Sequence, residues 1–117
     1  MATANEAQRD LDILKHIEYY CKDAIEAAHQ AGNESAFAEN RLYQHAVAMC
    51  ILEIGELSKH LSAGFLQEHS EVPWRAICRM RDMYAHHYHI TDSHQLWMTV
   101  AEDLPMLQSF CDGLIPG

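Results

Sequence analysis

The chain has 117 residues, of which 49% are hydrophobic, with only five glycines and three prolines. This length and composition suit one globular domain over residues 1–117, and they exclude a disordered, fibrous or two-domain chain. The formal net charge of −9 argues against broad, sequence-independent binding of nucleic acid, because phosphate neutralisation supplies most of that affinity. Any nucleic-acid function must therefore use a local site, whereas an acidic surface suits a basic protein partner.

The cysteines and the N-terminus both indicate a cytoplasmic protein. None of Cys21, Cys50, Cys78 and Cys111 forms a Cys-x-x-Cys pair, and dispersed cysteines of this kind usually behave as small buried apolar residues. The N-terminus lacks a basic start followed by an apolar run, and no apolar stretch approaches the ~20 residues needed to span a bilayer. We therefore expect no signal peptide, no disulfide framework and no membrane association.

Two long helices are predicted in the first half of the chain, over about residues 6–31 and 39–60. The first carries apolar residues at alternating intervals of four and three, the spacing of a helix face that packs in a bundle core: Ile13, Ile17, Tyr20, Ala24, Ala27 and Ala31. Leu14, Cys21 and Ala28 widen this stripe. Gly32 follows as a stop signal. The second carries Val47, Ile51, Ile54, Leu57 and Leu61. Its lone Gly55 costs about 1 kcal/mol relative to alanine, which indicates close packing of a neighbouring helix.

Two further helices are predicted in the second half. A short one runs from Trp74 to about residue 85 or 86, directly after Pro73, and we expect Trp74, Ile77 and Cys78 to face the core. The last begins near residue 93 and keeps the same rhythm through Trp97, Val100, Leu104, Leu107, Cys111 and Leu114. Pro105 should kink or restart it. With no alternating strand pattern, the sequence predicts an all-α, antiparallel four-helix bundle, with or without an extra short helix.

Residues 81–89 concentrate the groups that can carry chemistry. Within nine residues the chain has Arg81, Asp82, two tyrosines and His86, His87 and His89. Arginine is permanently charged and binds phosphate in a forked geometry, and histidine exchanges protons near neutral pH. Together they suffice to cut a phosphodiester without a metal: an imidazole deprotonates the ribose 2′-OH, arginine stabilises the phosphorane, and an acid protonates the leaving oxygen.

Helix geometry limits how Arg81 and His86 can cooperate. Five residues apart on an unbroken helix, they lie about 140° apart around the axis and cannot reach one atom. Either the helix unwinds before His86, or two chains share the site. A symmetric dimer is the more attractive solution, because it brings two arginines and two histidines into one cleft and so provides both a general base and a general acid.

Structural interpretations of the same residues remain open. Arg81 can simply pair with a carboxylate such as Glu56 on the neighbouring helix, and His86 can be a capping or core histidine. The clustered histidines 86, 87 and 89 can also suggest a metal site. However, adjacent positions on a helix diverge, and no Glu-x-x-His or His-x-x-x-His pattern completes a helical site, so we expect no bound metal.

Five landmarks in order carry a resemblance to a known family. They span about residues 9–114, and are Arg9, Ile54-Gly55-Glu56, Pro73-Trp74, Arg81-Asp82-x-x-x-His86-x-Tyr88, and Trp97 with Asp103-Leu104-Pro105-x-Leu107. In these the chain resembles the HepT-like proteins, toxin components within the HEPN superfamily of small helical domains. One departure is Asp82, where many members have asparagine. A carboxylate near an RNA phosphate is unfavourable unless it orients Arg81 or His86 by hydrogen bonding.

The resemblance implies a homodimeric, metal-independent endoribonuclease toxin that acts on RNA and needs no cofactor. Arg81 and His86 of both protomers would be catalytic, with Asp82 and Glu56 in support. It also implies a partner, a minimal nucleotidyltransferase antitoxin, which in this family can transfer AMP to the tyrosine that corresponds to Tyr88. Tyr84 is a rival acceptor by position, and either tyrosine can instead seal the bundle.

Three hypotheses follow from these patterns. The first is the endoribonuclease toxin with Arg81 and His86 as its catalytic residues. The second is a non-catalytic helical module that binds a nucleotidyltransferase and is adenylated at Tyr88, which the acidic charge and Asp82 favour. The third is a purely structural dimer, in which Arg81 and His86 are buried against carboxylates and line no cleft.

Overall fold

The computed structural model describes residues 3–87 and 93–116, and almost all of them are helical. Three long helices, α1 (Ala4–Ala31), α3 (Arg41–Lys59) and α5 (Trp74–His87), precede a last helical stretch composed of α6 (Ser93–Met98), a π-helical turn (Thr99–Asp103) and α7 (Leu104–Leu114). The connections contain two short helices, α2 (Glu34–Glu39) and α4 (Ala63–Glu68). The described residues contain no strand, so the predicted all-α fold is confirmed.

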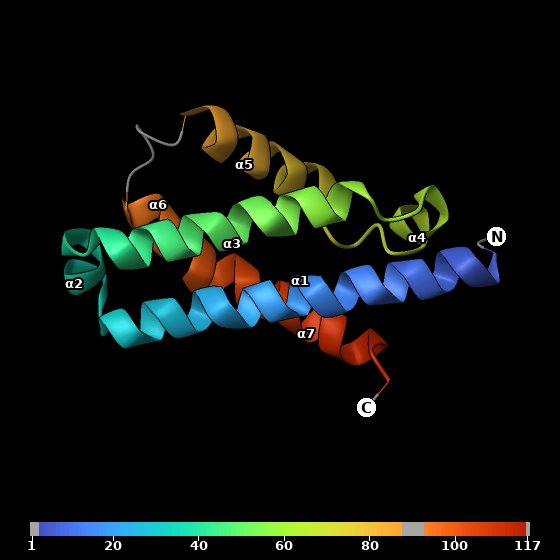
Figure 1. The fold of residues 1–117 in the computed structure, drawn as a ribbon, viewed down its shortest axis with the longest axis horizontal. Helices are drawn as coiled ribbons and strands as arrows, with labels where there is room; N and C mark the ends of the chain where they lie inside the picture. Colours follow the sequence, from blue (N-terminus) through green and yellow to red (C-terminus); the bar gives the residue numbers. More distant parts are fainter. Residues whose placement is uncertain (1–2, 88–92, 117) are drawn as a thin grey trace.

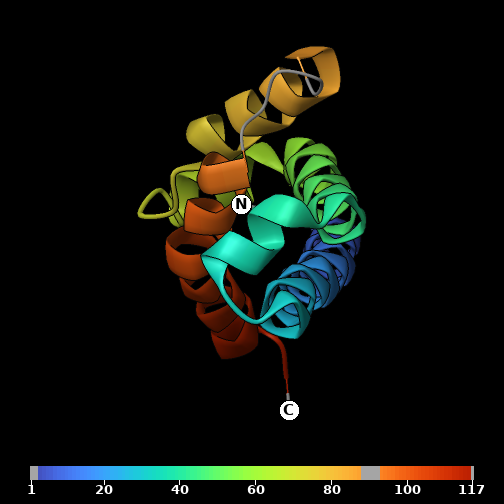
Figure 2. The same ribbon diagram turned by 90° about the vertical axis from the view of Figure 1, so that its left-hand side faces the viewer.

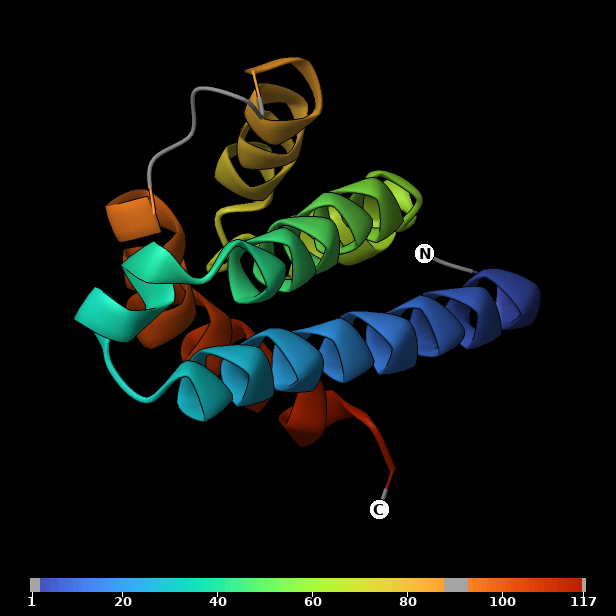
Figure 3. The ribbon, with the colours of Figure 1, turned by 60° about the vertical axis from the view of Figure 1, so that its left-hand side comes forward.

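The long helices run in alternating directions, as expected for an antiparallel bundle. Figure 1 shows α1 and α3 side by side along the long axis, with α7 crossing behind α1. Figures 2 and 3 show α5 on the outer side of α3, away from α1. Helix α5 therefore packs mainly against α3 and presents much of its remaining surface outward.

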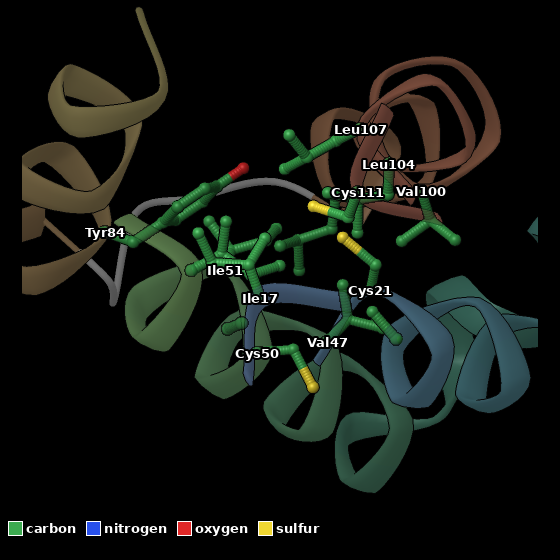
Figure 4. Close-up of a cluster of buried hydrophobic side chains, with 14 of the residues drawn as sticks. Ile17, Cys21, Val47, Cys50, Ile51, Tyr84, Val100, Leu104, Leu107 and Cys111 are labelled. Carbon is green, nitrogen blue, oxygen red and sulfur yellow. The ribbon is translucent and has the colours of Figure 1, made fainter. Parts of the chain in front are cut away.

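The core lies between α1, α3 and α7, and α5 closes it with a tyrosine. Figure 4 shows this cluster, in which Tyr84 reaches in from α5 among residues of the other three helices. The predicted apolar faces are largely confirmed, but the buried line of α1 is centred on Leu14, Ile17, Cys21, Ala24 and Ala28. Tyr20, Ala27 and Ala31 lie at its margin, and Leu114 is exposed. Helix α1 packs against both α3 and α7, so its buried face points between them.

The cysteines behave as small core residues, as predicted. Cys21, Cys50 and Cys111 are buried, Cys78 is half-buried, and all four are free thiols. Burial raises the pKa of Cys50 to about 11 and that of Cys111 to about 12, because the thiolate would lose its hydration. These thiols are therefore neutral and poorly reactive at physiological pH.

The sequence leaves room for one extra short helix, whereas the structure has two, α2 and α4, and side-chain caps define both. Asn33 accepts a hydrogen bond from the backbone N–H of Ala36 at the start of α2, and Ser62 accepts one from Phe65 at the start of α4. Asp10 on α1, only 3% exposed, accepts from the Ser62 backbone N–H at 2.9 Å and from its hydroxyl at 2.6 Å. This buried carboxylate ties α4 to α1.

The interruption predicted at Pro105 is present as a π-helical turn just before it. Proline has no N–H and its ring clashes with the carbonyl four residues earlier, here that of Ala101. The chain responds by widening its turn, so that the N–H of Leu104 bonds to the carbonyl of Thr99, five residues back. Helix α7 then restarts with Pro105 in its first turn. Over the described ranges, no helix has both the length and the apolar character needed to cross a membrane.

Candidate active site

Gly55 brings α5 against α3 at the level of Arg81. A Cβ atom added at Gly55 would lie 2.1 Å from the Cβ of Arg81 and 3.3 Å from the backbone carbonyl of Ile77. No side chain fits in that space, so the glycine is required by the close approach of the two helices. The prediction that Gly55 permits close packing is confirmed, and this approach places Arg81 beside Glu56 of α3.

Two carboxylates hold the guanidinium of Arg81. Its Nη2 lies 3.2 Å from Oε1 of Glu56 on α3, and its Nη1 donates to Oδ1 of Asp82 at 3.2 Å. The side chain is 28% exposed, and its Nε is buried without a hydrogen-bond partner among the described residues. The pairing with Glu56 considered from the sequence is present, yet Arg81 stays partly open to solvent and is not sealed in the core.

Asp82 is held by two cations. Its Oδ1 accepts from Nζ of Lys59 at 2.7 Å as well as from Arg81. The hydrogen bond from Lys59, followed by that from Arg81, lowers the pKa of Asp82 below its usual value, so the carboxylate is charged at neutral pH. A carboxylate at position 82 is acceptable near a phosphate if it orients Arg81. The hydrogen bond from Arg81 to Asp82 provides this orientation.

Lys59 and His60 also belong to this cluster, although neither was predicted from the sequence. His60 lies 3.3 Å from Oε2 of Glu56, the carboxylate whose other oxygen faces Arg81. Lys59 and His60 follow Glu56 by three and four residues, and this spacing places them on one side of a helix. That signal was available in the sequence, but it points to a cluster only once the register of α3 against α5 is known.

His86 lies on a different side of α5 from Arg81. Helix α5 continues unbroken to His87, so the proposed unwinding before His86 is wrong, because the backbone keeps its hydrogen bonds through that residue. The two side chains are therefore about 140° apart around the axis. His86 is exposed, which rules out a core role. One chain alone does not bring Arg81 and His86 to one atom.

The remaining candidate residues are either buried in the core or lie outside the described ranges. Tyr84 is 0% exposed, so the idea that it rivals Tyr88 as an acceptor of AMP is wrong, because its hydroxyl is not accessible. Tyr88 and His89 lie outside the described residues, as does the side chain of His87. Trp74 is buried as predicted, and within the described ranges no three His, Cys, Asp or Glu side chains form a group able to hold a metal ion.

An apolar hollow of about 310 Å³ lies between α5 and α7, on the side of α5 opposite to His86. It is lined by apolar side chains that include Ile77, Met80 and Leu107, with Glu71 and Asp103 beside them. The charged residues of α5 that surround Arg81 and His86 do not enter this hollow. The candidate chemistry therefore belongs to the α3 side and the outer side of α5.

Comparison with known proteins assigns this architecture to a family. Residues 11–114 match the model of the family described as "Ribonuclease HepT-like". The chain belongs to the HepT-like family. A Thermococcus cleftensis protein named "Probable ribonuclease HepT" is 38% identical over 89 residues, which are 74% of this chain and 81% of that protein. A Caldanaerobacter subterraneus subsp. tengcongensis protein named "Putative RNase TTE0752" is 32% identical over 95 residues, 81% of this chain and 84% of that protein.

A third similar protein comes from Methanocaldococcus jannaschii. Named "Putative RNase MJ0125", it is 26% identical over 109 residues, 92% of this chain and 93% of its own length. No solved structure matches the chain significantly. The matched region contains α3 and α5 complete, and hence every residue of the Arg81 cluster.

Proposed function

We propose that this HepT-like chain is a metal-independent endoribonuclease whose active site contains Arg81 and His86 from both protomers of a homodimer. The observation that carries the proposal is that helix α5 has an exposed histidine, His86, and a partly exposed arginine, Arg81, which carboxylates hold in place. The relatives of this chain are named as ribonucleases. Because one helix separates the two side chains by about 140°, the proposal requires a second copy to complete the site.

The proposed reaction is a transesterification followed by product release. His86 of one protomer takes the proton of the ribose 2′-OH, and the 2′ oxygen attacks the adjacent phosphorus. The bond from phosphorus to the 5′ oxygen breaks, and that oxygen receives a proton from His86 of the partner, which acts as the general acid. Arg81 stabilises the charge of the phosphorane. The products are a 2′,3′-cyclic phosphate and a 5′ hydroxyl, and no metal takes part.

Glu56 and Asp82 act as positioning residues in this scheme. These two carboxylates compensate the charges of the two cations that face them, Arg81 and Lys59. A guanidinium held at both ends loses less conformational freedom when a phosphate arrives. The phosphate then replaces one carboxylate contact, or binds the remaining N–H groups on Nη1 and Nη2 of Arg81.

RNA cleavage in excess EDTA tests the catalytic part of the proposal. We expect the wild type to cleave a mixed-sequence RNA with the metal removed, and both Arg81→Ala and His86→Ala to lose this activity. His60→Ala is the matched control, because His60 is an exposed histidine that contacts the Arg81 cluster through Glu56. If His60→Ala is inactive and His86→Ala cleaves normally, the assignment of His86 is wrong.

Subunit mixing tests whether one cleft needs both protomers. Wild type and His86→Ala are unfolded together in equal amounts and refolded, so that about a quarter of the dimers contain two wild-type chains if association is random. A cleft that needs both histidines retains about a quarter of the original activity, whereas two independent sites retain about half. Retention of half would contradict the shared site and leave the ribonuclease activity intact.

We also propose that the protein is a cytoplasmic toxin, neutralised by a nucleotidyltransferase that adenylates Tyr88. The net charge of −9 suits a basic partner surface, and the burial of Tyr84 leaves Tyr88 as the acceptor in this segment. Co-expression with the nucleotidyltransferase should add one AMP to the peptide that contains residue 88, and Tyr88→Phe should abolish the addition. Loss of growth suppression on co-expression without any added mass would argue against adenylation. A protein that lacks nuclease activity even when unmodified, but is still adenylated at Tyr88 by its partner, would favour a non-catalytic binding module.

A further inference from the structure

A groove between α5 and the α3 and α4 segments is bordered by basic side chains. It has a volume of about 350 Å³, and Lys59 on α3 and Arg75, Arg79 and Asp82 on α5 line it beside the apolar Leu66, Trp74 and Cys78. Arg75, Arg79, Asp82 and His86 follow one another at intervals of four, three and four residues, the spacing of a single stripe along a helix. The exposed His86 therefore lies on the same line of α5 as the two arginines of the groove.

The basic residues of this chain are concentrated here. The whole chain has eight lysines and arginines against 17 acidic residues. Four of the eight, Lys59, Arg75, Arg79 and Arg81, belong to the groove or to the adjoining arginine cluster. In a protein with net charge −9, a polyanion can approach only where positive charge accumulates locally.

Arg75 and Arg79 differ from the other two cations because their charge is not compensated. Lys59 and Arg81 each face a carboxylate at 2.7 to 3.2 Å. Arg75 and Arg79 are exposed and form no ion pair with any residue in the described ranges. Since they are four residues apart on one helix, their Cα atoms lie about 6 Å apart along the axis and on the same face.

The groove leads to the candidate catalytic residues through Asp82. This residue lines the groove, and its Oδ1 accepts from both Lys59 and Arg81. A strand bound along Arg75 and Arg79 is thereby directed toward His86 along α5 and toward Arg81 across Asp82. The chain thus joins an uncompensated basic surface to its candidate active site on consecutive turns of one helix.

We infer that the groove lined by Lys59, Arg75 and Arg79 binds backbone phosphates of single-stranded RNA next to the scissile phosphate. The inference rests on the proposed function, and it assigns the binding of the substrate backbone to residues other than Arg81. Such contacts are insensitive to base sequence, and their strength falls with salt, because each neutralised phosphate releases counterions.

RNA binding by the His86→Ala protein tests the inference without interference from cleavage. In that background, Arg75→Ala/Arg79→Ala is compared with Lys15→Ala/Lys22→Ala, which makes the same change of charge at exposed positions of α1. A labelled single-stranded RNA of mixed sequence is titrated over a range of salt concentrations. Loss of two phosphate contacts should reduce the slope of log K against log salt by about 1.4, and weaken binding about tenfold at about 0.2 M and about sixtyfold at about 0.05 M salt.

The outcomes separate this inference from the proposed function. A slope that falls with Arg75 and Arg79 but not with the α1 lysines supports the groove, even if the wild type proves unable to cleave RNA. Equal slopes for the two double variants overturn the groove, even if the wild type is an active nuclease. Absence of RNA binding by the His86→Ala protein also overturns it.

Discussion

Replacement of Gly55 by alanine should weaken the packing that positions Arg81. The added Cβ would lie 2.1 Å from Cβ and 2.7 Å from Cγ of Arg81, whereas carbon atoms in contact stand about 3.5 Å apart or more. The Cβ of Arg81 cannot rotate away, so α5 must move outward by about 1.4 Å. Overpacking of this kind costs up to about 3 kcal/mol, and the better helix propensity of alanine returns about 1 kcal/mol.

The expected net loss in the free energy of unfolding of Gly55→Ala is therefore about 2 kcal/mol, or roughly 8 °C in Tm. Gly113→Ala is the matched control, since Gly113 is also helical and nothing lies within 4 Å of its added Cβ. We expect this control to be unchanged or slightly stabilised. Urea unfolding followed by circular dichroism, at one protein concentration, measures both variants. Equal midpoints would refute the claim that Gly55 sets the approach of α5.

Three further perturbations test other parts of the structure. Asp10→Ala should lose about 2 to 3 kcal/mol of unfolding free energy, because two hydrogen bonds to a buried carboxylate disappear. The exposed Asp12→Ala on the same helix should change stability little, and equal effects of the two variants would contradict a stabilising role for the Asp10–Ser62 hydrogen bonds. Asp82→Asn should change stability little, because exposed ion pairs contribute little, and should raise RNA affinity at low salt in the cleavage-deficient background; weaker binding would mean that the carboxylate assists RNA binding. Raising the pH should destabilise the fold, because Cys50 and Cys111 ionise near 9 when unfolded but only near 11 and 12 when folded. Their contribution is complete below pH 9 and is lost as pH rises toward those values, so the urea midpoint should fall from pH 8 to pH 10.5, and should fall less when both cysteines are replaced by alanine.

Long amphipathic helices were predictable because their periodicity extends over several turns. The predicted bounds of the helices now described as α1 and α3 lie within about two residues of those observed. Helices α2 and α4 have six residues each, too few for an apolar period to appear. Phe37 is the one buried side chain of α2, and α4 has none. The sequence features that mark these two helices are their capping residues, Asn33 and Ser62. A capping residue alone predicts a helix only when the structure of the neighbouring segments is known.

The candidate site was predictable in its residue types but not in its contacts. Arg81, His86 and Glu56 were selected from spacing and resemblance, and the pairing of Arg81 with Glu56 follows from packing two neighbouring helices. The Lys59–Asp82 ion pair joins residues 23 apart, and the Asp10–Ser62 bond joins residues 52 apart. Such pairs depend on the register between helices, which Gly55 sets through a close approach and which no periodicity specifies.

The most direct test of the account is RNA cleavage by the purified protein in excess EDTA, with Arg81→Ala and His86→Ala assayed beside the wild type. If Arg81 and His86 form the active site, the wild type cleaves RNA to 2′,3′-cyclic phosphate ends and both variants, still folded, do not. Full cleavage by either folded variant, or cleavage by the wild type only when a metal ion is added, would contradict it.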